Sequence, residues 1–190
     1  MVGRRHTPTV LVVVALLWVF SPARAAEPAD MPPPQQAFLL WQQGYLHHLY
    51  GNYDKAIEMF RQSIAVYPTA EGHTYLGWSL SKQDKLGEAI AECRNAIALD
   101  PDYGNPYNDI GVYLIELGRP DEAIPWLEKA MQAKRYCCYQ FAHFNLGRIL
   151  LLKGDLEEAK RAFERALSYD PGYVPALRGL DYIEQQGETL

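Results

Sequence analysis

The sequence predicts an all-α fold, a solenoid of four helix–turn–helix units followed by one further helix. Two ladders of small residues predict it. One is made of glycines: Gly44, Gly77, Gly111 and Gly147. The other is made of alanines: Ala56, Ala89, Ala123 and Ala159. Both ladders advance by 33, 34 and then 36 residues, and a shared irregularity indicates true internal repeats because chance matches would not shift together.

The clearest unit spans residues 140–173 and provides the template for the others. Gly147 marks a close contact in its first helix, and Gly154 follows as a turn. Ala159 and Phe163 then stand four residues apart on a second helix, and Pro171 closes the unit. Laid along the chain, this template predicts units at residues 37–69, 70–103, 104–139 and 140–173.

Each upstream unit is expected to contain two helices. The first helices are predicted at about residues 35–50, 70–82 and 105–117, and the second helices at about 54–66, 86–99 and 121–133. Pro125 falls inside one of them, where we expect a slight kink and no break, because N–H groups early in a helix lack partners anyway. The third unit has Arg135 where a closing proline would stand, and its two extra residues fall in a lengthened joint at 134–139.

The last residues, 174–190, are expected to form a helix to about residue 186 and a tail. Leu177, Leu180 and Ile183 lie on one side of this helix, and polar residues occupy the other. A helix of this kind is typical of a cap that shields the end of a repeat array from water.

The first 25 residues are predicted to be a secretory signal peptide. Arg4 and Arg5 precede an apolar run from Val10 to Phe20, and a small-residue pattern ends at Ala25, where we expect cleavage. The run is shorter than the roughly 20 residues of a membrane span, although an uncleaved anchor is the alternative. We therefore expect export, to the periplasm in a bacterium, with the proline-rich residues 26–35 as a tether.

Composition limits the partners and the chemistry. The net charge is −5, and the predicted signal peptide removes three arginines and no acid, so nucleic acid and anionic membranes are not expected partners. No catalytic, phosphate-binding or CxxC signature is present, and adjacent His47 and His48 point about 100° apart on a helix. We expect no enzyme activity, cofactor or metal. Cys93, Cys137 and Cys138 could remain thiols, form an intermolecular bridge, or close a vicinal disulfide at 137–138.

The repeat resembles the tetratricopeptide repeat family. Its pattern of leucine, glycine, alanine, a large apolar residue and proline matches Leu146, Gly147, Ala159, Phe163 and Pro171. The resemblance implies a right-handed superhelix in which one face of each unit's first helix lines a groove that binds a peptide or helix of a partner. We call this the first-helix face.

By helical spacing, the first-helix face is expected to carry ten partner-binding residues: Phe38, Trp41, Gln42, Tyr45, Trp78, Asn108, Asp109, Phe144, Asn145 and Arg148. Gln42, Asp109 and Asn145 occupy equivalent positions, where the family often places an asparagine, and Tyr75 interrupts that series. The alternative is that Phe38, Trp41 and Phe141 only pack between adjacent first helices or under the proline-rich tether.

The sequence therefore favours a non-enzymatic scaffold or adaptor in the cell envelope, as part of an envelope, pilus or secretion assembly. A glycan-binding or accessory module of an envelope enzyme is the alternative, since aromatic faces also stack on sugar rings. A redox or metal protein would rest only on the cysteines and scattered histidines.

Overall fold

The computed structural model describes residues 31–187 of the 190-residue chain, and within that range the fold is all-α. The helices there are α1 (Pro33–Leu49), α2 (Tyr53–Val66), α3 (Ala70–Ser81), α4 (Leu86–Leu99), α5 (Asn105–Glu116), α6 (Pro120–Gln132), α7 (Tyr139–Lys153), α8 (Leu156–Tyr169) and α9 (Val174–Gly187). The predicted fold class is confirmed. The expected signal peptide and residues 26–30 of the expected tether lie outside the described residues.

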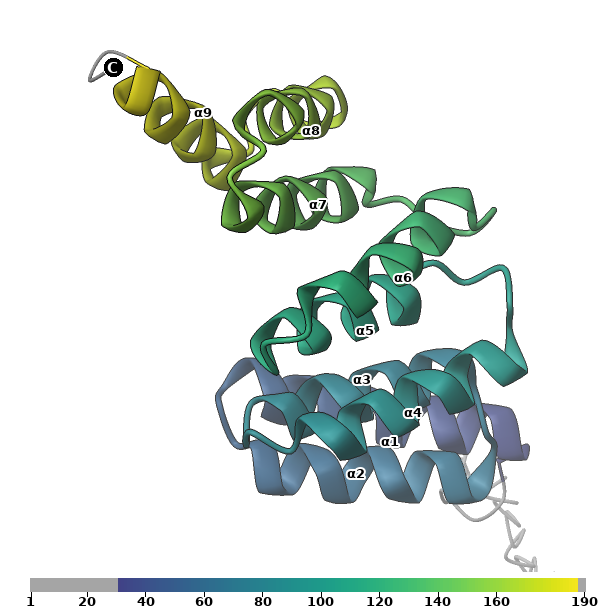
Figure 1. The fold of residues 1–190 in the computed structure, drawn as a ribbon. Helices are drawn as coiled ribbons and strands as arrows, with labels where there is room; N and C mark the ends of the chain where they lie inside the picture. The colour runs from purple at the N-terminus through teal and green to yellow at the C-terminus, as the bar shows by residue number, and fades with distance from the viewer. Residues whose placement is uncertain (1–30, 188–190) are drawn as a thin grey trace, which may run out of the picture. The chain divides into compact units, whose positions relative to one another are not determined.

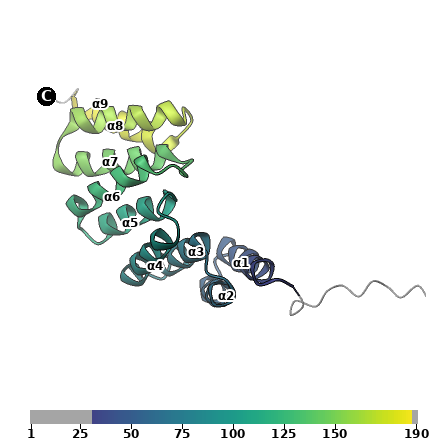
Figure 2. The same ribbon diagram turned by 90° about the vertical axis from the view of Figure 1, so that its right-hand side faces the viewer.

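The helices pack in chain order as four antiparallel pairs. α1 packs on α2, α3 on α4, α5 on α6 and α7 on α8, and each second helix also contacts the next first helix (Figures 1 and 2). The first helices α1, α3, α5 and α7 contact one another in succession, and α7 contacts α9. The array thus has one row of first helices, which is the row expected to carry the partner site.

The glycine ladder marks the seam inside each pair. A Cβ built on Gly147 would lie 2.5 Å from Cε1 of Phe163, and one on Gly44 would lie 2.8 Å from Cε1 of Phe60. Phe60 and Phe163 are fully buried, each on the second helix of its pair. Glycine is needed here because any side chain would force the two helix axes apart.

The turn between paired helices uses the left-handed backbone region. Gly154 ends α7 with a φ of 81°, and Gly51 and Gly118 have positive φ at the equivalent place. The second unit has Asp84 there instead, with a φ of 60°. Aspartate tolerates this region better than most residues, but only glycine enters it without a Cβ penalty.

Pro33 and Pro125 both lie within helices, one at the start of α1 and one inside α6. α1 begins at Pro33, inside the range expected to be tether, because proline suits the first turn of a helix, where its missing N–H has no partner. α1 thus begins about two residues before the first helix expected at residue 35. Pro125 lies within α6, which runs on to Gln132, so the helix is unbroken as predicted.

The lengthened joint folds back onto the preceding connection. The Arg135 N–H donates to the Asp102 carbonyl (2.8 Å), and the Gly104 N–H donates to the Arg135 carbonyl (3.1 Å). The Arg135 guanidinium lies 4.1 Å from the ring centre of Tyr103 and pairs with Asp100 at 2.6 Å. It also pairs with Glu71 at 2.7 Å, so the residue that replaces the closing proline links the second and third units.

Helix α9 packs on α8 and α7 through Ala176, Leu180 and Ile183. A Cβ on Gly179 would lie 2.6 Å from Cε2 of Phe163, so α9 approaches that ring as closely as α7 does. Leu177, expected on the apolar side, is exposed instead, because the contact stripe is centred one residue earlier. α9 thereby covers the apolar side of the last pair.

Candidate partner-binding face

At the start of the first-helix face, aromatic rings from α1 form a continuous stack. Trp41 stacks on Phe38 with ring centres 6.0 Å apart and on Tyr45 at 5.5 Å. Tyr75 of α3 meets Trp41 and Tyr45 edge-on, at 5.0 and 5.5 Å. Phe38 is 54% exposed, whereas Trp41 and Tyr45 are half-buried, so this stack is part core and part open surface.

Trp78 continues the aromatic row on α3 and is 41% exposed. One of its faces stacks on the His48 ring at 5.1 Å. His48 is buried and lies 2.9 Å from the Ser79 hydroxyl through Nδ1, and burial, then Lys82, lowers the pKa of its imidazole. The histidine therefore supports Trp78 by stacking on it while its own ring is held by Ser79.

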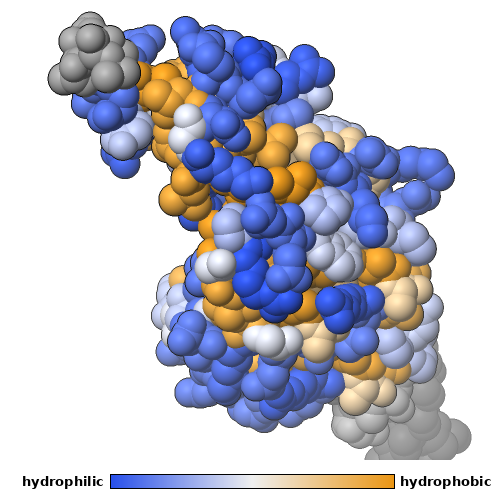
Figure 3. Space-filling view, in the orientation of Figure 1, coloured by the Kyte–Doolittle hydropathy of each residue, from blue (hydrophilic) through white to orange (hydrophobic). Residues whose placement is uncertain are grey.

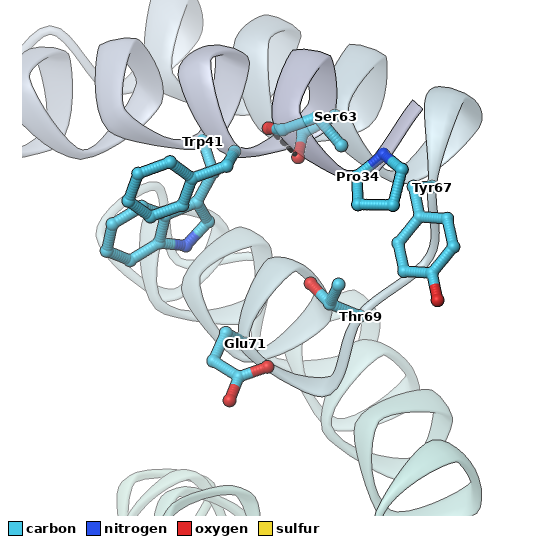
Figure 4. Close-up of a pocket in the computed structure, with 8 residues that line it drawn as sticks. Pro34, Trp41, Ser63, Tyr67, Thr69 and Glu71 are labelled. Carbon is cyan, nitrogen blue, oxygen red and sulfur yellow. Dashed lines mark hydrogen bonds between the residues drawn. The ribbon is translucent and has the colours of Figure 1, made fainter. Parts of the chain in front are cut away.

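The Trp41 pocket, about 330 Å³, lies between the start of α1 and the α2–α3 connection. It is lined by Pro34, Ala37, Phe38, Trp41, Ser63, Tyr67, Thr69 and Glu71. In Figure 4, Trp41, Tyr67 and Glu71 surround it from three sides. The Trp41 indole N–H is buried and has no acceptor among the described residues.

At the centre of the face, a chain of hydrogen bonds links α7 to α5. Arg148 Nη1 donates to Asn145 Oδ1 (3.1 Å), and Asn145 Nδ2 donates to Asn108 Oδ1 (3.2 Å). Asn108 Nδ2 then donates to Asp109 Oδ1 (3.5 Å). Asn108 and Asn145 are buried, so these two predicted site residues contact each other across the helix interface.

Asp109 lies at the end of that chain, in a second pocket that we call the Asp109 pocket. Its lining comes from α3, α5, the joint and α7: Thr74, Tyr75, Trp78, Asn105, Asn108, Asp109, Tyr136, Cys138 and Phe141. Burial raises the pKa of the Asp109 carboxyl to about 7, with the Asn108 hydrogen bond acting in the opposite direction.

The far end of the face is more apolar. Phe144 packs edge-on against Tyr173 (5.4 Å) and contacts Phe163, while the Arg148 guanidinium lies 5.9 Å from the Phe144 ring centre. Phe141 is 39% exposed and also meets Tyr173. Gln42, by contrast, is exposed on α1. On the side drawn in Figure 3, hydrophobic residues run between hydrophilic ones along the array.

The structure joins eight of the ten predicted residues in two groups, four in the α1–α3 aromatic row and four in the α5–α7 polar chain. Gln42 and Phe144 belong to neither group. The sequence missed Tyr67 in the Trp41 pocket, and Tyr136 and Cys138 in the Asp109 pocket. The longer third repeat spacing, 36 residues, did indicate the joint at 134–139, which contains Tyr136 and Cys138. Tyr75 interrupts the series of Gln42, Asp109 and Asn145, yet it contacts Trp41 and Trp78 and lines the Asp109 pocket.

Within residues 31–187, no cluster of three or more His, Cys, Asp or Glu is arranged to hold a metal ion. In the same range, no helix is long and apolar enough to cross a bilayer. Cys93 is buried as a free thiol, and the sulfurs of Cys137 and Cys138 lie 2.6 Å apart.

Sequence profiles described as tetratricopeptide repeat match residues 51–104, 107–135 and 140–173. The chain belongs to the tetratricopeptide repeat family. Tetratricopeptide repeat arrays are solenoids that present extended concave binding surfaces, so the fold is that of a protein-interaction scaffold.

Known proteins of this family resemble the chain in part. Mitochondrial import receptor subunit TOM70 of Rattus norvegicus is 26% identical over 136 residues, 70% of this chain and 22% of that protein. The chain spans about a fifth to a quarter of the length of the first curated relatives it matches. Among solved structures, Pseudomonas aeruginosa PilF has a TM-score of 0.77 and 22% identity over 84% of this chain and 72% of that chain. PilW, a type IV pilus biogenesis factor, has a TM-score of 0.71 and 19% identity over 82% and 77%. These likenesses establish the shared fold.

Proposed function

We propose that the chain is a non-enzymatic scaffold whose first-helix face binds a peptide or helix of a partner protein. The observation that carries this proposal is the row of partly open aromatic rings from Phe38 to Trp78, continued by the polar groups of α5 and α7. Trp41 and Tyr45 pack partly against the core, but Phe38 and Trp78 stay 54% and 41% exposed, which core packing alone does not require.

The Trp41 pocket supports a peptide as the ligand. Around Trp41, the pocket lining combines apolar rings with polar side chains such as Thr69 and Glu71, a mixture that suits a peptide segment. The apolar rings of Phe38 and Tyr67 beside Trp41 offer contact area for a side chain. A sugar could use the same rings, and this keeps the glycan-binding alternative as an outcome of the test.

The proposed location is the cell envelope, after removal of the signal peptide. The leader pattern of residues 1–25 supports export, and the fold is shared with the pilus biogenesis factor PilW. We propose participation in an envelope, pilus or secretion assembly on these two grounds.

The experiment is site-specific photocrosslinking in cells that produce the chain. A photoreactive phenylalanine analogue replaces Phe38 or Phe141, both exposed on the first-helix face, or Tyr50, which is exposed where α1 ends. Protein adducts at positions 38 and 141 but not at 50 are expected.

Adducts of equal yield at all three positions, or at Tyr50 alone, would contradict a partner site on this face. Adducts at 38 and 141 that contain glycan and no second protein would replace the scaffold with the glycan-binding alternative. Far-ultraviolet circular dichroism of each substituted protein controls for folding.

A further inference from the structure

The Asp109 pocket contains a carboxylate for which the described part of the chain supplies no cation. The ion pairs formed by residues 31–187 involve other acids, and the polar partner of Asp109 is the Asn108 amide at 3.5 Å. Arg148 reaches this carboxylate only through two intervening amides. Asp109 therefore has no ionic partner among the described residues.

The titratable groups that sense Asp109 are neutral in the physiological range. Burial, and after it the Asp109 charge, raises the pKa of Cys93, Tyr113 and Tyr136. Tyr75 is affected in the same direction, first by burial and then by neighbouring charges that include Asp109. None of these groups can neutralise the carboxylate.

The aromatic side chains that line the Asp109 pocket also suit a cation. Trp78 and Phe141 are both partly exposed and line the pocket, and Tyr75 meets Trp78 edge-on at 5.5 Å. Aromatic faces attract ammonium and guanidinium groups through the ring quadrupole, and the attraction is larger where water is displaced. A partly buried carboxylate without a cationic partner costs stability, so an arrangement kept only for packing would not need it.

We propose that the Asp109 pocket binds a lysine or arginine side chain of the partner segment, with Asp109 as its ion-pair partner and Trp78 and Phe141 as aromatic walls. This inference rests on the proposed function, since it names the chemistry of one side chain in the bound segment. The hydrogen-bond chain from Arg148 orients the Asn108 amide toward Asp109 and thereby fixes the carboxylate. The net charge of −5 would also steer basic segments toward the protein.

The test begins with selection of binders from a displayed library of random 12-residue peptides on the immobilised chain. Three versions are compared: the wild type, D109N, and E128Q as a matched control. Glu128 is exposed on α6, so E128Q makes the same charge change outside the pocket. We expect lysine or arginine to be enriched at one fixed position of the binders of the wild type and of E128Q, and not among binders of D109N.

The strongest wild-type binder is then compared with a copy in which norleucine replaces the basic residue. Norleucine keeps the apolar stem and removes the charge, so we expect about tenfold weaker binding to the wild type and less than about twofold weaker binding to D109N. The wild-type measurement does not depend on how D109N folds.

Binders without an enriched basic residue, or an equal loss on wild type and D109N, would overturn this inference and leave the proposed function standing. If no version retains any peptide, the proposed peptide site fails and this inference fails with it. If lysine or arginine enrichment is lost equally in E128Q and D109N, the basic residue is attracted by the general negative charge. That result would also overturn the Asp109 pocket as its binding site.

Discussion

Asn145 of α7 donates a hydrogen bond of 3.2 Å to Asn108 of α5, across 37 residues of sequence and inside a buried interface. Asn145 also accepts from Arg148, so N145A leaves an acceptor on Asn108 and a guanidinium without partners. We expect N145A to lower the free energy of unfolding by about 1–3 kcal/mol. Urea denaturation measures this, with N95A as the control because Asn95 is exposed on α4. Equal losses in both variants would contradict a structural role for the pair.

The seam between α7 and α8 predicts a sharp difference between two glycines. G147A places a Cβ 2.5 Å from the buried Phe163 ring and should cost about 1–3 kcal/mol through overpacking. Gly87 lies in α4 with open space around it, so G87A should be neutral or stabilising by up to about 1 kcal/mol. The melting temperature should fall in G147A and stay equal or rise in G87A. An unchanged melting temperature in G147A would contradict the close contact between Gly147 and Phe163.

The turn between α3 and α4 offers a stabilising substitution at Asp84. Asp84 has a φ of 60° where three other units have glycine, so D84G should raise the free energy of unfolding by about 1 kcal/mol. The reverse change, G118D, should lower it by a similar amount. Denaturant midpoints of both variants check the prediction, which fails if the two shifts have the same sign.

The raised pKa of Asp109 predicts a pH-dependent gap between the wild type and D109N. An unfolded aspartate loses its proton near pH 4, whereas the folded carboxyl, with a pKa of about 7, keeps it longer. Folding therefore binds a proton in this window, and the wild type loses stability relative to D109N as pH rises from about 4 to about 7.

Thermal melts at pH 5 and pH 8 measure that gap. The melting temperature of D109N should exceed that of the wild type by more at pH 8 than at pH 5. Above pH 8 this difference should stay constant. His48 and His143 also titrate with lowered pKa values, but they are present in both proteins and cancel in the difference. A gap that is independent of pH would show that Asp109 ionises at its ordinary pKa.

The cysteines should differ in reactivity. Cys93 is buried and burial raises the pKa of its thiol, whereas Cys137 is exposed and Cys138 half-buried. Burial, and after it Cys137, raises the pKa of the Cys138 thiol to about 12. N-ethylmaleimide should therefore add a first label at Cys137, a slower second label at Cys138 and a third only after unfolding, as counted by intact mass over time. Early labelling of Cys93 would contradict its burial.

The same experiment without reductant distinguishes the states left open for the joint. Two labels indicate free thiols at 137 and 138, and no label with a mass lower by two hydrogens indicates a vicinal disulfide. A covalent dimer on a non-reducing gel indicates an intermolecular bridge.

The sequence by itself determined the periodic part of this protein. Gly147 and Phe163 can be assigned to one seam from spacing alone, because a repeated unit must make the same close contact each time it occurs. The helix ranges follow for the same reason, and Gly154 predicts the turn between the last two paired helices. These features depend on neighbours within one unit, which lie within about 35 residues.

Only the tertiary structure decided which first-helix residues remain open. Asn108 and Asn145 share the face with Trp78, yet they bury each other while Trp78 stays partly exposed. Arg135 and Tyr136 break the repeat, and the ion-pair partners of Arg135, Glu71 and Asp100, lie in the preceding unit. Exposure and charge compensation are sums over groups from several units. A pattern that repeats within each unit therefore cannot specify that Asp109 would be left without a cation.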